Sequence, residues 1–453
     1  MKTLHSMKLI TLFIAFVLHS SMSAQEFAIT APEKVGMSSE RLAYLTSTFQ
    51  EYVDNEELPG AVILVARRGQ IAYFKSFGQS DIKNNISMEE NSIFRIASQT
   101  KAIVSVGIMM LQEQGKLLIS DPVGKYIPAF NETKVAETNK DGGYEIVKSN
   151  RPITIRDLLT HTSGIGYGRG IASELWEKAK IQDWYFADRD EPIQATVKRM
   201  ASLPFEAQPG EKFVYGYNTD ILGALIEVVS GEPLNTFLKN QILDPLDMKD
   251  THFYLPKNKK ERLTVVYSPT ENGLERAADS GGMVGQGAYV NGRRISFSGG
   301  AGYLSTALDY AKFLQMMLND GEFNDKRLIS SKTAELMTVN HLGEVTFPWA
   351  KGTGFGLGFY TVNDLGLRGL LGSKGEYGWG GAYHSKYWVD PEENLVVVYF
   401  TQLIPAKGRE DHGMLRALVY QVIIDYLCLI PEKCIKHITS GYTRRPPTKN
   451  IMH

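Results

Sequence analysis

Apolar segments near the two ends of the chain predict the strands of a sheet. An amphipathic stretch at 38–53 predicts a helix, and the apolar runs 61–66 and 71–74 that follow it predict a β-hairpin. Two further runs, 386–389 and 395–401, lie near the other end and are joined by a turn rich in proline, aspartate and asparagine. Strands are therefore expected from both ends of the chain.

The central part of the chain follows mostly the helical period. Amphipathic segments at 154–159 and 219–229 predict helices, a glycine-rich stretch at 260–300 predicts loops, and 306–319 predicts another helix. We therefore expect an α+β fold. An antiparallel sheet built from both chain ends would carry flanking helices and an inserted, mainly helical lobe at about 98–260.

Composition and charge narrow the class of protein. The chain has 453 residues, of which 43% are hydrophobic and 22% charged, as in ordinary globular proteins. A formal net charge of -1 gives no support to a nucleic-acid partner. The histidines never fall at metal-ligand spacing, so we expect no metal. The two cysteines, Cys428 and Cys434, would either form a disulfide or remain as two buried thiols.

The start of the chain has the features of a secretory signal peptide. In residues 1–24, two lysines precede an apolar run at 9–18, which is too short to span a membrane, and small residues follow it. This predicts export to a periplasm or beyond, without a lipidated cysteine and without a membrane span in the mature protein. We expect one domain at 25–435 and a disordered tail at 436–453.

A serine and a lysine at helical spacing are the strongest chemical signal. Ser98 and Lys101 stand at the start of an apolar, helix-like stretch, where one helical turn brings hydroxyl and amine to the same face. Ser80 and Lys83 have the same spacing, but turn-forming residues surround them. Taken by spacing alone, Ser98 is more often just the N-cap of a helix.

Several stretches, in order, resemble the serine hydrolase family related to class C β-lactamases and penicillin-binding proteins. Phe94-Arg95-Ile96-Ala97-Ser98-Gln99-Thr100-Lys101 resembles its nucleophile motif. The resemblance extends over about 32–426, and it is closest to the β-lactamase-like carboxylesterase branch. The other matching stretches are 157–164, 209–215, 221–231, 245–250 and 305–310.

The second motif of that family supplies a tyrosine, and two places in the chain compete for it. Tyr289-Val290-Asn291 matches the family's Tyr-x-Asn letter for letter, but it lies in a glycine-rich loop too late in the chain. Tyr215 stands where the family's tyrosine is expected, and Tyr217 is the reserve candidate. His161 is expected to be structural, because the resemblance already gives the role of base to Lys101.

Two departures from the lactamase pattern indicate an esterase. Tyr217 stands where lactamases carry an asparagine that holds the substrate's amide. Trp379-Gly380-Gly381 replaces Lys-Thr-Gly, and a tryptophan cannot supply the cation that binds a substrate carboxylate. We expect Tyr217, Trp379, Gly380, Gly381 and His384 to contact the substrate.

The resemblance implies a mechanism that needs no cofactor. Ser98 would attack the carbonyl of a small-molecule ester or amide, while Lys101 and Tyr215 act as general base and acid. The oxyanion would lie between the backbone N–H groups of Ser98 and Ala382. A β-lactamase or D-alanyl-D-alanine carboxypeptidase, an acyltransferase, and a non-enzymatic cell-wall module remain as alternatives. The physiological substrate and the oligomeric state stay open.

Overall fold

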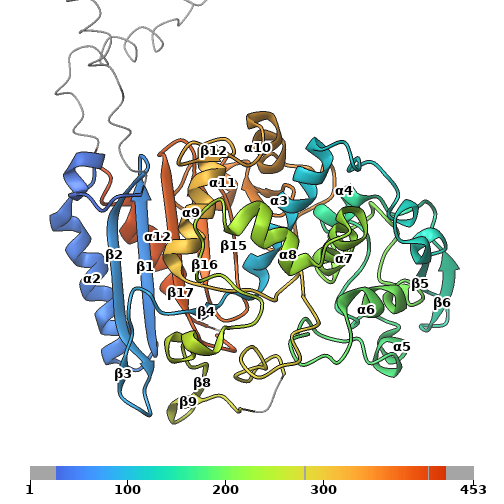
Figure 1. Cartoon of the computed structure of the whole chain (residues 1–453), viewed down its shortest axis with the longest axis horizontal. Helices are drawn as coiled ribbons and strands as arrows, with labels where there is room; N and C mark the ends of the chain where they lie inside the picture. Colours follow the sequence, from blue (N-terminus) through green and yellow to red (C-terminus); the bar gives the residue numbers. More distant parts are fainter. Residues whose placement is uncertain (1–26, 280–281, 407, 425–453) are drawn as a thin grey trace, which may run out of the picture.

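The computed structural model of this chain describes residues 27–279, 282–406 and 408–424. Its largest feature is an antiparallel sheet in which strands from the two ends of the chain lie side by side (Figure 1). This confirms the predicted α+β fold with a sheet built from both chain ends. In order across the sheet, the strands are β13 (Thr353–Phe355), β14 (Tyr360–Val362), β15 (Tyr377–Gly380), β16 (Lys386–Asp390), β17 (Leu395–Thr401), β1 (Gly60–Arg67), β2 (Gln70–Asp81) and β3 (Ile86–Ser87).

Both faces of the sheet are covered, which explains why β1 is a continuous apolar run. Val62 faces one hydrophobic core and Ile63 faces the other. Helices α2 (Ser39–Asp54) and α12 (Asp411–Tyr420) cover the second face, and α9 (Ala307–Leu318) covers the first (Figure 1). The sheet is therefore the middle layer of a three-layer arrangement.

The helices flanking the sheet begin where side chains cap them. Ser38 accepts a hydrogen bond from the N–H of Arg41, so α2 starts one residue later than the sequence pattern suggests. Thr306 accepts from the N–H of Asp309 in the same way and starts α9. Both predicted helices are present, and each is shifted at its start because the first residue of the pattern is the cap.

The region inserted between the two sets of strands is mainly helical, as expected. It lies beside the sheet, at its right in Figure 1. Its helices are α3 (Thr100–Glu113), α4 (Ile155–Leu159), α5 (Ser173–Lys178), α6 (Ile193–Met200), α7 (Asn218–Ser230) and α8 (Leu234–Leu238).

A small sheet in this region was not predicted. Strands β5 (Lys134–Thr138) and β6 (Tyr144–Lys148) form a hairpin, and β7 (Pro204–Phe205) pairs with β5 in parallel. Asn139 makes the turn, because its side-chain oxygen accepts from the N–H groups of Asp141 and Gly143 at 3.1 and 2.9 Å.

The remaining elements are short. The stretch at 260–300, predicted as loops, contains one hairpin, β8–β9. The short elements are the 3₁₀ turn η2 (Ala97–Gln99), the strands β4 (Phe94–Arg95), β8 (Tyr267–Thr270), β9 (Gly273–Arg276), β10 (Leu304–Ser305), β11 (Glu322–Phe323) and β12 (Lys326–Arg327), and the helices α10 (Ser331–Thr338) and α11 (Leu365–Arg368).

Some sequence-based predictions lie outside the described residues. These are the signal peptide at 1–24, the tail at 436–453 and the pairing of Cys428 with Cys434. In the part of the chain that the structure describes, no single helix is long and apolar enough to cross a membrane. One bent pair, α7 with the segment from Leu234 to Leu243, meets the criteria of length and composition only.

A buried carboxylate joins α12 to the sheet. Glu376, directly before β15, is fully buried, and Arg416 of α12 donates to both of its oxygens at 2.6 and 2.8 Å. Arg368 and the hydroxyls of Tyr360 and Tyr420 also donate to it. Burial alone would raise the pKa of Glu376, but the hydrogen bonds and charges of the two arginines outweigh it and hold this pKa below its usual value.

Replacing Arg416 with methionine should lower the free energy of unfolding by about 3 kcal/mol or more, because it leaves a buried carboxylate short of its main partner. Chemical denaturation measures the loss. The control is Lys332→Met, which removes an exposed ion pair with Glu335 and should cost less than about 0.5 kcal/mol. Equal losses in the two variants would contradict the role given to Arg416.

Candidate active site

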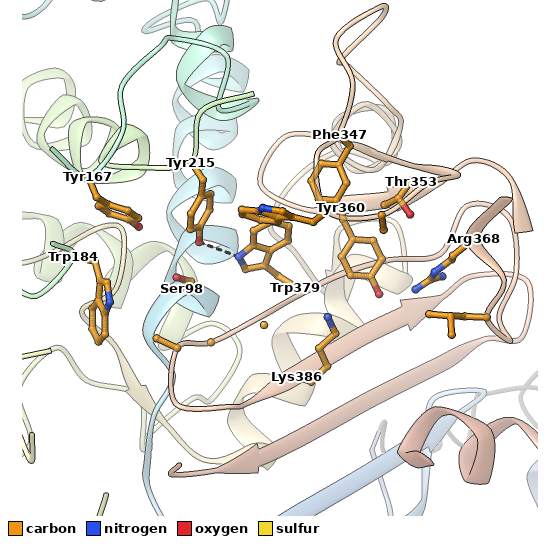
Figure 2. A pocket seen from close by; sticks show the side chains of 16 residues that line it. Ser98, Tyr167, Trp184, Tyr215, Phe347, Thr353, Tyr360, Arg368, Trp379 and Lys386 are labelled. Carbon is orange, nitrogen blue, oxygen red and sulfur yellow. Dashed lines mark hydrogen bonds between the residues drawn. The ribbon is translucent and has the colours of Figure 1, made fainter. Parts of the chain in front are cut away.

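Ser98 lies in the 3₁₀ turn between β4 and α3, with its hydroxyl at the wall of a cavity (Figure 2). It is not a capping residue, because Gln99 occupies the N-cap position of α3 and no side chain caps this helix. Its Oγ instead accepts a hydrogen bond from Nζ of Lys101 at 3.3 Å. Ala97, directly before it, has a φ of 42°, a strained conformation of the kind that clusters at functional sites.

Lys101 is a buried cation held by three parts of the chain. Only 2% of the residue is exposed. Besides the serine, its Nζ donates to the hydroxyl of Tyr167 at 3.2 Å and to the carbonyl of Gly300 at 2.8 Å. The same atom lies 4.6 Å from the ring centre of Tyr215. All three donors of the ammonium group are therefore used, and an aromatic ring faces it as well.

Asp220, in α7, fixes the carbonyl that Lys101 contacts. Its Oδ1 accepts from Ser298 Oγ at 2.6 Å and from the N–H of Gly300 at 3.0 Å. Burial raises the pKa of Asp220, and the hydrogen bond from Ser298 and the charge of Lys101 oppose this. A buried carboxylate thus stands behind the buried ammonium and orients the loop between them.

The ring of Tyr215 faces Lys101, and a residue of the sheet binds its hydroxyl group. Its hydroxyl accepts a hydrogen bond from Nε1 of Trp379 at 3.0 Å, and its ring lies 4.7 Å from that of His161. His161 is buried, and its Nδ1 pairs with the side chain of Asn218 at 2.9 Å. Burial, and then the charge of Lys101, lower the pKa of His161 well below its usual value. The neutral imidazole of His161 therefore packs against the ring of Tyr215. This contact fits the structural role that we expect for His161.

The turn after β15 is pressed against the segment that carries Ser98. A Cβ on Gly381 would lie 2.5 Å from the carbonyl oxygen of Ile96, so only glycine fits there. Nε2 of Gln99 donates to Ser385 Oγ at 3.1 Å and joins the two segments a second time. Ala382 lines the cavity, and within the described residues its N–H has no hydrogen-bond acceptor.

The cavity has a volume of about 520 Å³ and extends to both sides of the serine. Figure 2 shows Tyr167 and Trp184 on one side, and Lys386, Tyr360 and Arg368 on the other. The lining residues are Ser98, Tyr167, Trp184, Tyr215, Phe347, Trp349, Ala350, Thr353, Tyr360, Arg368, Leu370, Trp379, Gly380, Gly381, Ala382 and Lys386.

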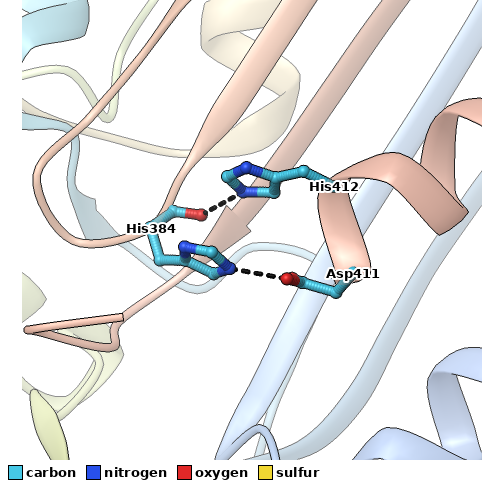
Figure 3. A group of neighbouring side chains, drawn as sticks. All are labelled: His384, Asp411 and His412. Carbon is cyan, nitrogen blue, oxygen red and sulfur yellow. Dashed lines mark hydrogen bonds and ion pairs between the residues drawn. The ribbon is translucent and has the colours of Figure 1, made fainter. Parts of the chain in front are cut away.

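The structure places most of the expected site residues together, but two lie elsewhere. Tyr217 is fully buried and donates its hydroxyl to the backbone carbonyl of Asp183 at 2.7 Å, so it is not at the cavity. His384 points away from the cavity, and its Nε2 pairs with Asp411 of α12 at 2.7 Å (Figure 3). The predicted substrate contacts of Tyr217 and His384 are wrong, because both polar groups are engaged within the fold.

Tyr289, the literal match to the family's second motif, also lies outside the cavity. Its side chain is buried, and its ring packs 6.0 Å from that of Tyr185. Position in the chain therefore selects Tyr215 where the letters alone select Tyr289.

His384, Asp411 and His412 come close enough to share an ion, since one ligand atom of each lies within 4.8 Å of the others. The donor set does not fit a metal, however. The two imidazole rings are stacked at 4.0 Å, so their lone pairs run parallel and do not converge. Nε2 of His412 donates to the carbonyl of His384 at 3.0 Å (Figure 3). Burial and the nearby His384 lower the pKa of His412 to about 3. The cluster therefore fixes the turn that carries Ala382 to α12 through the contact between His384 and Asp411.

Sequence reasoning missed ten of the residues that line the cavity, and four of these matter most for its chemistry. Tyr167 follows the predicted stretch 157–164 and stands between two glycines, which was the available signal for a tyrosine held at a special backbone position. Trp184 carried no signal. Arg368 and Lys386 reach the cavity from α11 and β16.

Lys386 also corrects the argument from Trp379. The tryptophan does replace the family's lysine on β15, but Lys386 stands opposite Gly380 on the neighbouring strand and lines the same cavity. The site therefore does contain a cation. Lys374, the other lysine near Trp379 in the sequence, is exposed and does not line the cavity.

Comparisons with known proteins agree with this geometry. A model of the family described as Beta-lactamase matches residues 45–421. Esterase EstB from Burkholderia gladioli is 30% identical over 373 residues, which cover 79% of this chain and 90% of that protein. Lovastatin esterase from Penicillium rubens is 27% identical over 389 residues, covering 80% of this chain and 94% of that protein.

A solved structure extends the comparison to the fold. EstCE1, described as a hydrolase with promiscuous acyltransferase activity, aligns with a TM-score of 0.72 and 27% identity. The alignment covers 84% of this chain and 99% of that chain. The similarity thus extends over most of the fold.

Replacing Gly381 with alanine should lower the free energy of unfolding by about 1–3 kcal/mol, because the backbone at Ile96 must move to admit the new methyl group. Thermal denaturation measures this. The control is Gly413→Ala in α12, where an added Cβ meets no atom within 4 Å and alanine favours the helix. If both variants unfold at the wild-type temperature, the close contact of the turn with Ile96 is not tight.

Proposed function

The chain belongs to the Beta-lactamase family, and its esterase relatives point to a serine hydrolase of the carboxylesterase type; from this we propose that it cleaves carboxylic esters through an acyl-enzyme on Ser98. The observation that carries the proposal is the hydrogen bond between Ser98 Oγ and the buried Nζ of Lys101 at the wall of the cavity. A hydroxyl in contact with an amine is the arrangement that acyl transfer needs.

In the proposed reaction, Lys101 first releases one proton, because an ammonium group has no lone pair with which to act as a base. Ser98 Oγ then forms a bond to the ester carbonyl carbon as its own proton passes to the pair formed by Lys101 and Tyr215. The C–O bond to the alcohol then breaks, and the same pair returns the proton to the leaving oxygen. Water then attacks the carbonyl carbon of the acyl-enzyme and gives a proton to the same pair. The bond from that carbon to Ser98 Oγ breaks as the pair returns a proton to Oγ. Lys101 contacts Ser98 Oγ directly and faces the ring of Tyr215, which supports their action as one unit.

Negative charge that develops on the carbonyl oxygen needs fixed donors. We assign this role to the backbone N–H groups of Ser98 and Ala382. Ala382 lines the cavity with its N–H free of acceptors in the described structure, and the Gly381 turn holds it against the Ser98 segment. Such a donor typically contributes on the order of 10² to 10³ in rate.

The cavity favours esters with apolar groups but leaves acyl transfer open as a second function. Trp184, Phe347 and Trp349 give much of its wall an aromatic surface, which would hold an apolar acyl or alcohol group. An alcohol bound there would compete with water for the acyl-enzyme, and the similar protein EstCE1 is described as a hydrolase with promiscuous acyltransferase activity. Export of the enzyme remains a proposal that rests on residues 1–24 alone.

A fluorophosphonate should add a single adduct to the protein, and Ser98→Ala should abolish it together with hydrolysis of p-nitrophenyl butyrate, because no other serine shares the contact with Lys101. Intact-mass analysis reads the adduct. Ser80→Ala is the matched control, since Ser80 Oγ donates to backbone carbonyls of β3 and lies outside the cavity. Labelling that persists in Ser98→Ala would overturn the assignment.

Lys101→Met and Tyr215→Phe should each lower kcat by roughly 10² or more, because each removes part of the proton path. The double variant should lose much less than the product of the two, as expected for groups that act together. Tyr289→Phe is the control and should keep near-wild-type kcat. Tyr167→Phe should have the smaller effect of losing one acceptor of Lys101; if it abolishes turnover while Tyr215→Phe does not, Tyr167 is the catalytic tyrosine.

A further inference from the structure

Two cations line the end of the cavity that Trp379 separates from Ser98. Lys386 projects from β16, and Arg368 stands at the end of α11. In Figure 2, their charged ends point toward the same region beside Tyr360. The proton path proposed above uses neither of them.

The ammonium group of Lys386 has no anionic partner. Within the described part of the chain it forms no hydrogen bond and no ion pair, and its Nζ lies 5.4 Å from the ring centre of Tyr360. Burial, and then the charges of Arg416 and Arg368, lower the pKa of Lys386 to about 8, while Glu376 opposes this. A buried charge without a counterion is costly unless a ligand supplies one.

Arg368 has donors to spare at the same place. Its side chain is only 7% exposed, and its Nη2 donates to Glu376 at 3.0 Å. Its Nη1 is buried and has no hydrogen-bond partner. Buried guanidinium donors are nearly always satisfied, so Arg368 keeps unused hydrogen-bonding capacity beside the cavity that it lines.

The charges around this end of the cavity do not balance. Arg416, Arg368 and Lys386 are cationic, and Glu376 is the carboxylate that faces them. Arg416 already occupies both oxygens of Glu376. The end of the cavity is therefore electropositive, and apolar walls from Trp379 and Leu370 strengthen its attraction for an anion.

We propose that Lys386 and Arg368 form a carboxylate subsite, so that the enzyme acts on esters that carry a second, free carboxylate. This rests on the proposed esterase function and adds the class of substrate. One oxygen of the carboxylate would accept from Nζ of Lys386 and the other from the guanidinium group of Arg368, whose side chain must turn to bring Nη1 to the cavity. The acid group can belong to the acyl part or to the alcohol part of the ester.

The test compares anionic and neutral esters on one enzyme preparation. The acyl arm uses mono-p-nitrophenyl glutarate against p-nitrophenyl pentanoate, and the alcohol arm uses meta-(butanoyloxy)benzoate against phenyl butanoate. In at least one arm, the anionic ester should have a kcat/KM about tenfold higher or more, the worth of a charged hydrogen bond. The arm with this preference identifies the part of the substrate that carries the acid.

Lys386→Met should remove most of that preference, measured as the ratio of kcat/KM for the anionic ester to kcat/KM for the neutral ester on the same variant. Lys386→Arg should retain it. The matched control is Lys374→Met, which removes a positive charge from the exposed turn before β15 without touching the cavity. Its preference should be unchanged, because solvent screens that distant charge.

The pH dependence gives an independent readout. Lys386 is protonated below its pKa of about 8, so the preference for the anionic ester should be full at lower pH and should decline as pH rises through that value. The ratio to the neutral ester cancels changes in the proton path itself. In Lys386→Met the ratio should not vary with pH around this value.

Two kinds of failure can be told apart. If neutral esters are hydrolysed by Ser98 but neither arm prefers the anion, the carboxylate subsite is wrong and the esterase function stands. If no ester is hydrolysed, the proposed function fails. The subsite can still be tested, because calorimetry can measure the binding of glutarate to Ser98→Ala. Binding that is equal in Ser98→Ala and in Ser98→Ala with Lys386→Met would overturn it.

Discussion

The active-site geometry depends on the burial of one positive charge. An ammonium group out of water costs several kcal/mol unless acceptors surround it, and Lys101 has them from Ser98 in the turn before its helix, from Tyr167 and from Gly300. These three sources lie far apart in the sequence. The chain can therefore satisfy Lys101 only when the inserted helices and the loop before α9 are both in place, and the contact with Ser98 comes with that arrangement.

The sheet determines the other half of the site. The turn at 381–385 joins the neighbouring strands β15 and β16, and Gly381 allows this turn to touch Ile96 in the segment that carries Ser98. Asp411 of α12 binds His384 from the outer face of the sheet. Helix α12 covers an apolar face of the sheet and, through His384, also positions the N–H of Ala382. The stability of this outer layer and the geometry of the site are therefore linked.

Sequence reasoning could find what depends on local pattern and on order along the chain. The strands at both ends, Ser98, Lys101 and Tyr215 carried such signals. It failed where a side chain's direction is decided by tertiary packing: Tyr217 stands directly before α7, and its ring turns into the core toward Asp183. Lys386 could not be found from a motif, because its place at the cavity depends on the register between β15 and β16.

That register also explains how a tryptophan and a cation coexist in one site. The indole of Trp379 is committed to the hydroxyl of Tyr215, so this position on β15 orients the phenol and cannot also bind an anion. The pairing of Gly380 with Lys386 lets the next strand supply the charge instead. A Cβ at position 380 would lie 3.6 Å from Cδ of Lys386, so this glycine borders the lysine side chain directly. Orientation of the phenol and binding of an anion are thus divided between two adjacent strands. In the proposed subsite, β16 supplies the charge that binds the substrate's anionic group.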